Sequence, residues 1–132
     1  MLYHQDYSHV NKKNNNEKNV SIWIGNFQDN EQLENYLLME YLDNEDLPRS
    51  QFTKDFKIDY YDQDFQEAYC AGDFLSVENL IEPISYSETF INQIKSEDKN
   101  YNSLIAVYKY KYDGEVKQNS NIFFLGVYEY EE

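Results

Sequence analysis

The densest cluster of side chains that could do chemistry is a run of nine residues in the middle of the chain. Residues 59–67 read Asp-Tyr-Tyr-Asp-Gln-Asp-Phe-Gln-Glu, so four carboxylates alternate with aromatic and amide side chains. Carboxylates at this density can ligate a hard cation, act as general acid and base, or pair with a basic partner. Each of these chemistries makes its own demands on spacing and surroundings.

The first two chemistries fit this spacing poorly. An EF-hand calcium loop needs a glycine at its sixth position and a glutamate at its twelfth, and a loop that starts at Asp59 supplies neither. A glycosidase needs two carboxylates at a defined separation across a sugar cleft, and nothing in this pattern sets that separation. We therefore expect no metal ion and no cofactor.

Nucleophilic and phosphate-binding chemistry also lacks candidates. His4 and His9 lie in a polar N-terminal stretch, and Cys70 has no evident acid–base partner. Cys70 is the only cysteine, which excludes an internal disulfide and suits a small, partly buried hydrophobe. The four glycines form no phosphate-binding pattern. We therefore expect that the protein is not an enzyme.

The net charge of −14 is concentrated in the same middle region. Residues 29–88 hold 16 Asp and Glu against three basic residues, and so carry 13 of the 14 net negative charges. Such a surface repels nucleic acid and membranes and steers a basic protein toward itself. The sequence thus predicts a protein partner and no nucleic acid or membrane ligand. The expected contact residues are Asp59, Tyr60, Tyr61, Asp62, Asp64 and Glu67.

Two simpler interpretations of this segment stay open. A run of charge is often only a solvated surface. Alternatively, Asp62 and Asp64 cap backbone amides of the adjoining turn and serve the fold alone.

The length of 132 residues fits one domain. Residues 1–19 are polar and lack apolar periodicity, so we expect a flexible lead-in followed by a single domain over residues 20–132. The chain has no apolar run of signal-peptide length and none of about 18 residues that could span a bilayer. We expect a soluble cytoplasmic protein, and nothing in the sequence sets its oligomeric state.

The elements that position the acidic segment can be predicted from periodicity and capping signals. Residues 20–25 alternate as a strand, with Val20, Ile22 and Ile24 on one side and Trp23 on the other. Asp29 and Gln32 resemble a capping box and predict a helix over residues 30–41, with Tyr41 facing inward. Further short helices are expected after Ser50, Ser76 and Ser85, and residues 59–67 are expected to be irregular with a helical turn near Glu67.

The C-terminal third has the period of strands. Leu104, Ala106, Tyr108, Tyr110 and Tyr112 fall on one face of a long strand, Asp113-Gly114 marks a turn, and residues 122–128 form a second strand. The order of elements predicts an α+β domain. Its largely antiparallel sheet joins the N-terminal strand to a C-terminal meander, with the helices packed on one face.

Several of these segments resemble, in the same order, the bacterial immunity protein 22 family. The resemblance covers residues 20–128 and is carried by Trp23-Ile24-Gly25-Asn26-Phe27, Tyr61-Asp62-Gln63-Asp64-Phe65-Gln66-Glu67, Ser85-Tyr86-Ser87 and Phe124-Leu125-Gly126-Val127-Tyr128.

This resemblance implies a non-catalytic immunity protein of a polymorphic toxin system, which protects its producer by binding the toxic domain of a cognate toxin. Many such toxins are nucleases with basic surfaces, and the acidic middle of this chain fits that class. The alternative is an acidic nucleic-acid-mimic regulator or adaptor module with a non-toxin protein partner.

Overall fold

A computed structural model of the protein describes residues 18–41, 47–95 and 98–132. Residues 1–17, and with them His4, His9 and nearly all of the expected lead-in, lie outside the described residues. The same holds for residues 42–46 and 96–97.

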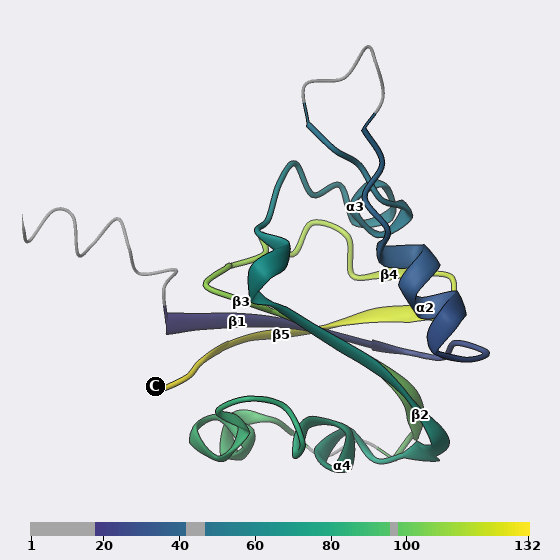
Figure 1. The fold of residues 1–132 in the computed structure, drawn as a ribbon. Coiled ribbons are helices and arrows are strands. Elements are labelled where there is room, and N and C mark those ends of the chain that lie inside the picture. Colours follow the sequence, from purple (N-terminus) through teal and green to yellow (C-terminus); the bar gives the residue numbers. More distant parts are fainter. Residues whose placement is uncertain (1–17, 42–46, 96–97) are drawn as a thin grey trace, which may run out of the picture.

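The centre of the molecule is a five-stranded sheet in which every pairing is antiparallel (Figure 1). Its strands are β1 (Asn19–Gly25), β2 (Gln66–Leu75), β3 (Tyr101–Tyr108), β4 (Gln118–Asn119) and β5 (Ile122–Glu129), in the order β2-β3-β1-β5-β4. The predicted α+β class and antiparallel sheet are confirmed. The C-terminal meander is not continuous, because β1 lies between β3 and β5 and pairs with both.

The helices lie on both faces of this sheet (Figure 1). Helices α2 (Asn30–Leu37) and α3 (Gln51–Phe56) cover the face that carries Trp23. Helix α4 (Val77–Ile81) and the 3-10 helices η3 (Ser87–Thr89) and η4 (Ile91–Gln93) cover the other face. The expectation that all helices pack on one face is therefore wrong. All eight residues of β3 are buried, so both faces of the central strands need an apolar cover.

Strand β1 has the predicted alternation. Val20, Ile22 and Ile24 enter the core under α4, whereas Trp23 enters the core under α2 and α3. The Trp23 ring is fully buried, and its centroid lies 4.8 Å from that of Phe52 and 5.2 Å from that of Phe124. Trp23 is thus the centre of an aromatic cluster that joins the sheet to α3.

Helix α2 begins as predicted but ends early. The Asp29 side chain accepts a hydrogen bond from the Gln32 backbone N–H at 2.9 Å. The helix stops at Leu37, and the backbones of Glu40 and Arg49 then pair with each other at 2.8 and 2.9 Å. This pairing draws the chain into an extended path, so the predicted continuation to residue 41 is wrong, and Tyr41 is 81% exposed instead of facing inward.

Two of the three expected serine caps are confirmed. Ser50 forms a capping box with Thr53 at the start of α3, and the Ser76 hydroxyl accepts a hydrogen bond from the Asn79 N–H at the start of α4. The helix expected after Ser85 is replaced by the short turns η3 and η4. The N–H of Ser85, the residue expected to cap that helix, donates instead to a carboxylate oxygen of Glu67 at 3.0 Å.

The long C-terminal strand is shorter than predicted. Lys109 has a left-handed backbone (φ 57°), which ends β3 at Tyr108 and turns the following residues toward the other face. Tyr110 and Tyr112 therefore join the Trp23 side of the core, so their expected place on the face of Leu104 is wrong. Buried Ser21 holds the new path, since its hydroxyl donates to the Tyr110 carbonyl oxygen and accepts from the Tyr112 N–H.

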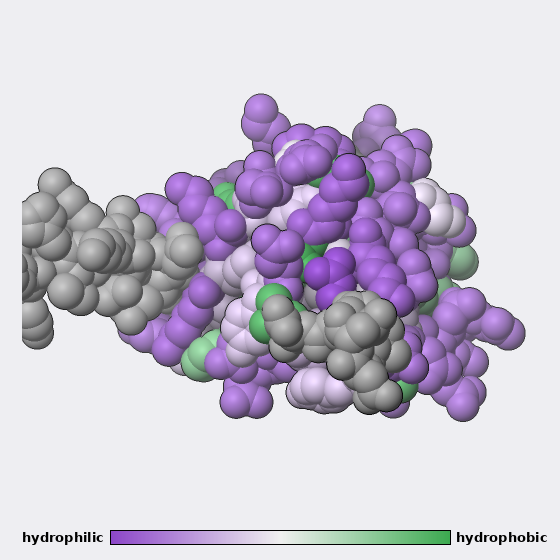
Figure 2. Space-filling view, turned by 90° about the horizontal axis from the view of Figure 1, so that it is seen from above, coloured by the Kyte–Doolittle hydropathy of each residue, from purple (hydrophilic) through white to green (hydrophobic). Residues whose placement is uncertain are grey.

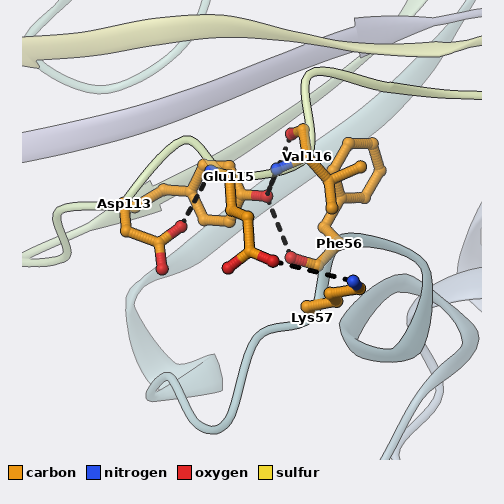
Figure 3. Close-up of polar contacts among 6 residues, drawn as sticks. Phe56, Lys57, Asp113, Glu115 and Val116 are labelled. Carbon is orange, nitrogen blue, oxygen red and sulfur yellow. Dashed lines mark hydrogen bonds and ion pairs between the residues drawn. The ribbon is translucent and has the colours of Figure 1, made fainter.

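The segment after β3 is tied to the end of α3 (Figure 3). The Tyr112 hydroxyl donates to the Phe56 carbonyl oxygen at 2.9 Å and accepts from the Val116 N–H at 3.0 Å. At the surface of this contact, Lys57 and Glu115 form an ion pair at 3.6 Å. These bonds fix the start of the segment that leads from α3 to the acidic residues.

The aromatic cluster predicts a large effect of Trp23→Ala. Removal of a fully buried ring should lower the free energy of unfolding by about 3–5 kcal/mol, because the surrounding rings relax only in part into the cavity. Urea unfolding of the purified protein measures this change. Tyr41→Ala removes an aromatic ring from the surface and should change the free energy by less than about 0.5 kcal/mol. Equal stability of the two variants would contradict the central role of Trp23.

A candidate protein-binding site at the start of strand β2

The six predicted contact residues lie on a turn that leads into the edge of the sheet. After α3 the chain passes through residues 59–62 into the 3-10 helix η2 (Gln63–Phe65) and then into β2, which is an edge strand. The helical turn expected near Glu67 therefore occurs just before it. Strand β2 itself was not predicted. Tyr69 and Ala71 pack on one core and Ala68 and Cys70 on the other, so apolar and polar residues do not alternate along it.

Four of the six side chains are exposed, namely those of Asp59, Tyr60, Asp62 and Asp64. Tyr60 is 57% exposed, which is unusual for so large a ring. Glu67 is half-buried, and Tyr61 is buried with only 3% of its surface exposed. The exposed residues thus form an acidic surface, and Tyr61 lies buried beneath it.

Tyr61 anchors the segment to the core. Its ring packs edge-on against Phe52 and at a tilt against Tyr110, and its hydroxyl donates to the Gln66 side chain at 2.5 Å. The buried Tyr61 side chain therefore fixes the backbone that carries the neighbouring carboxylates.

Asp62 combines exposure with a capping role. Its side chain accepts a hydrogen bond from the Asp64 N–H at 2.9 Å, which is the capping interaction left open by the sequence. Asp64 differs, because its carboxylate makes no hydrogen bond or ion pair with the described part of the chain. The capping interpretation therefore holds for Asp62 and not for Asp64.

Glu67 connects the acidic segment with the opposite layer of the molecule. One of its carboxylate oxygens accepts from the Ser85 N–H, and the Tyr108 hydroxyl donates to the Ser85 carbonyl oxygen at 2.6 Å. The N–H and the carbonyl group of Ser85 are thus bonded by side chains of β2 and β3, respectively. Burial, and after it the negative charge of Glu67, raises the pKa of Tyr108.

Two hollows flank residues 63–67. The first, of about 460 Å³, lies against α2 and includes Leu33, Leu38 and Gln63 in its lining. The second, of about 230 Å³, is hereafter the tyrosine pocket, and its main lining residues are Asp64, Phe65, Glu67, Tyr86, Tyr108 and Tyr130. Gln66 lines both hollows, so the acidic segment of residues 59–67, hereafter the ridge, ends between them.

The surface around the ridge is largely hydrophilic. From the side of α2 and α3, the molecule shows polar residues with only small apolar spots between them (Figure 2). Within residues 18–41, 47–95 and 98–132, the ion pairs are Lys18 with Glu131 and Lys57 with Glu115, and neither involves the ridge. The charges of the ridge are therefore not compensated by salt bridges within this described part.

Neither a metal centre nor a membrane segment is found in the described part of the chain. No three His, Cys, Asp or Glu side chains gather there closely enough to hold a metal ion, so the carboxylates of residues 59–67 do not converge. No described helix has the length and apolar character needed to cross a membrane.

The fold and this surface together define a small acidic α+β domain with an exposed carboxylate and aromatic ridge. The family model described as Immunity protein 22 matches residues 20–131, and the chain belongs to that family. Comparison with curated proteins and with solved structures gives no significant match. Family membership suggests a toxin-neutralising role with a protein toxin as the partner.

The sequence indicated the ridge but not the tyrosine pocket. Tyr86, Tyr108 and Tyr130 come from three separate segments, and only the folded chain places them beside Asp64 and Glu67. The one available signal was the Ser85-Tyr86-Ser87 segment, which the family resemblance already singled out.

The buried and half-buried tyrosines predict a loss of stability at alkaline pH. Burial, and then the charge of Asp113, raises the pKa of Tyr110 to about 12, and burial also raises the pKa of Tyr36, Tyr61 and Tyr108. The folded state thus keeps protons that the unfolded state releases above about pH 10. Stability should be independent of these groups below pH ~10 and should fall steeply between pH ~10 and ~12.

Urea midpoints at pH 8, 10 and 11 measure this loss, and absorbance of tyrosinate reports ionisation in the folded protein. An unchanged midpoint at pH 11, with early tyrosinate formation, would show that these hydroxyls are not buried as described.

Proposed function

We propose that the protein is a non-catalytic immunity protein that binds and neutralises the toxic domain of a cognate polymorphic toxin. The partner is a basic domain, and a nuclease is the class that fits this surface best. Binding takes place in the cytoplasm, where a nuclease meets its substrate. The ridge of residues 59–67 supplies the contact surface.

One observation carries this proposal beyond family membership. The ridge exposes Asp59, Asp62 and Asp64 together with Tyr60, and it makes no salt bridge within the described part of the chain. Carboxylates in such an array can occupy the positions that phosphates take on the basic surface of a nuclease. Exposed tyrosines add contact area of the kind that dominates interface energies.

The anchoring of the ridge supports the same role. Tyr61 is packed in the core, Asp62 caps η2, and Glu67 is held by Ser85. Their bonds order the backbone before any partner arrives. A pre-ordered surface loses less conformational entropy on binding, so more of the contact energy appears as affinity.

The direct test is neutralisation of the toxin encoded beside this protein's gene. Its toxic domain should co-purify with the protein, and co-expression should restore growth of cells that make the toxin. Failure of both would reject the proposal. Capture of a regulatory protein without any toxic activity would favour the adaptor alternative.

Asp62→Asn combined with Asp64→Asn tests the ridge. An asparagine at position 62 still accepts the hydrogen bond that caps η2, so the melting temperature should stay within a few degrees. Toxin binding should weaken, by roughly tenfold or more, because two charges of the contact surface are lost.

The matched control is Asp73→Asn combined with Asp98→Asn. Both residues are exposed, and they lie near the far end of β2, where Leu75 pairs with Tyr101. This control removes the same amount of charge and should leave the affinity for the toxin within about twofold. Exposed charges that lie more than a Debye length from the contact surface are screened by salt and contribute little to binding. Equal losses in the two double variants would assign the effect to net charge alone.

Salt dependence tests electrostatic steering separately. Raising the salt concentration from about 0.05 to 0.5 M should slow association markedly and change dissociation less, because screening acts on the approaching charges. Stopped-flow or surface-based kinetics with the purified toxic domain measure both rates. A salt-independent association rate would exclude steering by the acidic ridge.

A further inference from the structure

We propose that the tyrosine pocket receives a single arginine side chain of the partner. This inference rests on the proposed function, because it names the chemistry by which the toxic domain is recognised beside the ridge. The pocket lies at the meeting point of the ridge, the end of β3 and the turn before η3.

The size of the pocket suits one side chain. Its volume of about 230 Å³ is below the range of about 300–1,000 Å³ that is typical of sites for free small molecules. Two rings at its rim reach the surface, since Phe65 is 37% and Tyr86 39% exposed. A side chain that projects from a partner surface can therefore enter it.

The wall of the pocket is aromatic and ordered. The rings of Tyr86 and Tyr130 stack with centroids 5.4 Å apart and an interplanar angle of 23°, and Tyr108 meets Tyr130 edge-on at 5.1 Å. The backbone beside Tyr86 is fixed by the bonds of Ser85 to Glu67 and Tyr108. A planar cation can stack on such rings with little further ordering.

The negative charge of the pocket favours a cationic ligand. Asp64 and Glu67 line it, and neither makes a salt bridge within the described residues. Lys109 is its basic lining residue, and the Lys109 ammonium nitrogen lies 4.5 Å from the centroid of the Phe65 ring. One aromatic face of the pocket already holds a positive charge in this way, while both carboxylates stay without an ionic partner.

The geometry favours arginine over lysine. A guanidinium group is planar and carries five donors in a fixed fork, so it can stack on an aromatic ring and donate to a carboxylate at the same time. The Glu67 carboxylate is held in one orientation by the Ser85 N–H, which suits such directed bonds. A lysine ammonium offers the charge without the planar face.

Titration of the full chain with blocked amino acids tests this inference without the toxin. The probes are N-acetyl-arginine methylamide, the lysine equivalent and the citrulline equivalent, which has the shape of arginine without its charge. NMR should show saturable shifts of the Tyr86 and Glu67 signals with the arginine probe in the millimolar range, which corresponds to about 4 kcal/mol. The lysine probe should bind more weakly, and the citrulline probe should cause no saturable shift.

Two variants locate the binding. Glu67→Gln keeps an oxygen for the Ser85 N–H and removes the charge, and Tyr86→Leu keeps an apolar side chain and removes the aromatic face. Each should weaken the arginine probe at least about fivefold. Asp98→Asn, which removes a charge outside the pocket, should leave its binding unchanged.

The inference is overturned if the citrulline and arginine probes shift the same signals equally. It is also overturned if the arginine probe causes no saturable shift at Tyr86, or if folded Glu67→Gln binds it as the native protein does. These outcomes are independent of the proposed function. A protein that neutralises its toxin but ignores the arginine probe disproves the pocket alone, whereas arginine binding without any toxin partner disproves the proposed function.

Discussion

Burial of β1 on both of its faces is the constraint on which the rest of the structure depends. Trp23 points to one side of the sheet and Ile22 to the other, and neither side chain is exposed. A strand of this kind must lie inside the sheet, so β3 and β5 flank it and the helices divide between the two faces. Strand β2 is thereby left at the edge. The acidic ridge leads into this half-buried edge strand, and Tyr61 attaches it to the buried core around Trp23.

The ridge combines two roles, because one of its side chains is buried while most of the others are exposed. Tyr61 faces the core and Asp62 and Asp64 face the solvent, while Glu67 reaches across to Ser85. The inward residues contribute stability. Of the exposed residues, Asp62 caps η2 and Gln63 donates to the Leu37 carbonyl oxygen, whereas Asp64 makes no side-chain bond within the described part of the chain. The motif in this segment that resembles the family therefore mixes residues that hold the fold with residues that face the solvent, and the two kinds separate only once the burial of each side chain is known.

Local signals predicted what local interactions decide. The caps at Asp29, Ser50 and Ser76 depend on residues three positions apart, and the alternation of β1 follows from its own sequence. The errors arose where distant partners compete. Glu67 takes the N–H of Ser85 from 18 positions away, and the left-handed turn at Lys109 is held by Ser21 through residues that follow it. The exposure of the ridge carboxylates was likewise predictable from composition, whereas the tyrosine pocket needs three segments that only the fold brings together.

Among the residues that the structure describes, the ridge forms no ion pair, and under the proposed function this affects the energy of binding. Carboxylates packed on one surface repel each other, and this repulsion destabilises the compact free state. A lysine beside Asp64 would relieve the repulsion, but a partner would then have to displace it and expose it to water again. The described part of the chain places its salt bridges elsewhere, at Lys57 with Glu115 and at Lys18 with Glu131, and its cation nearest Phe65 rests on that ring. The unrelieved repulsion becomes a gain in affinity, because a basic partner removes it only when it binds.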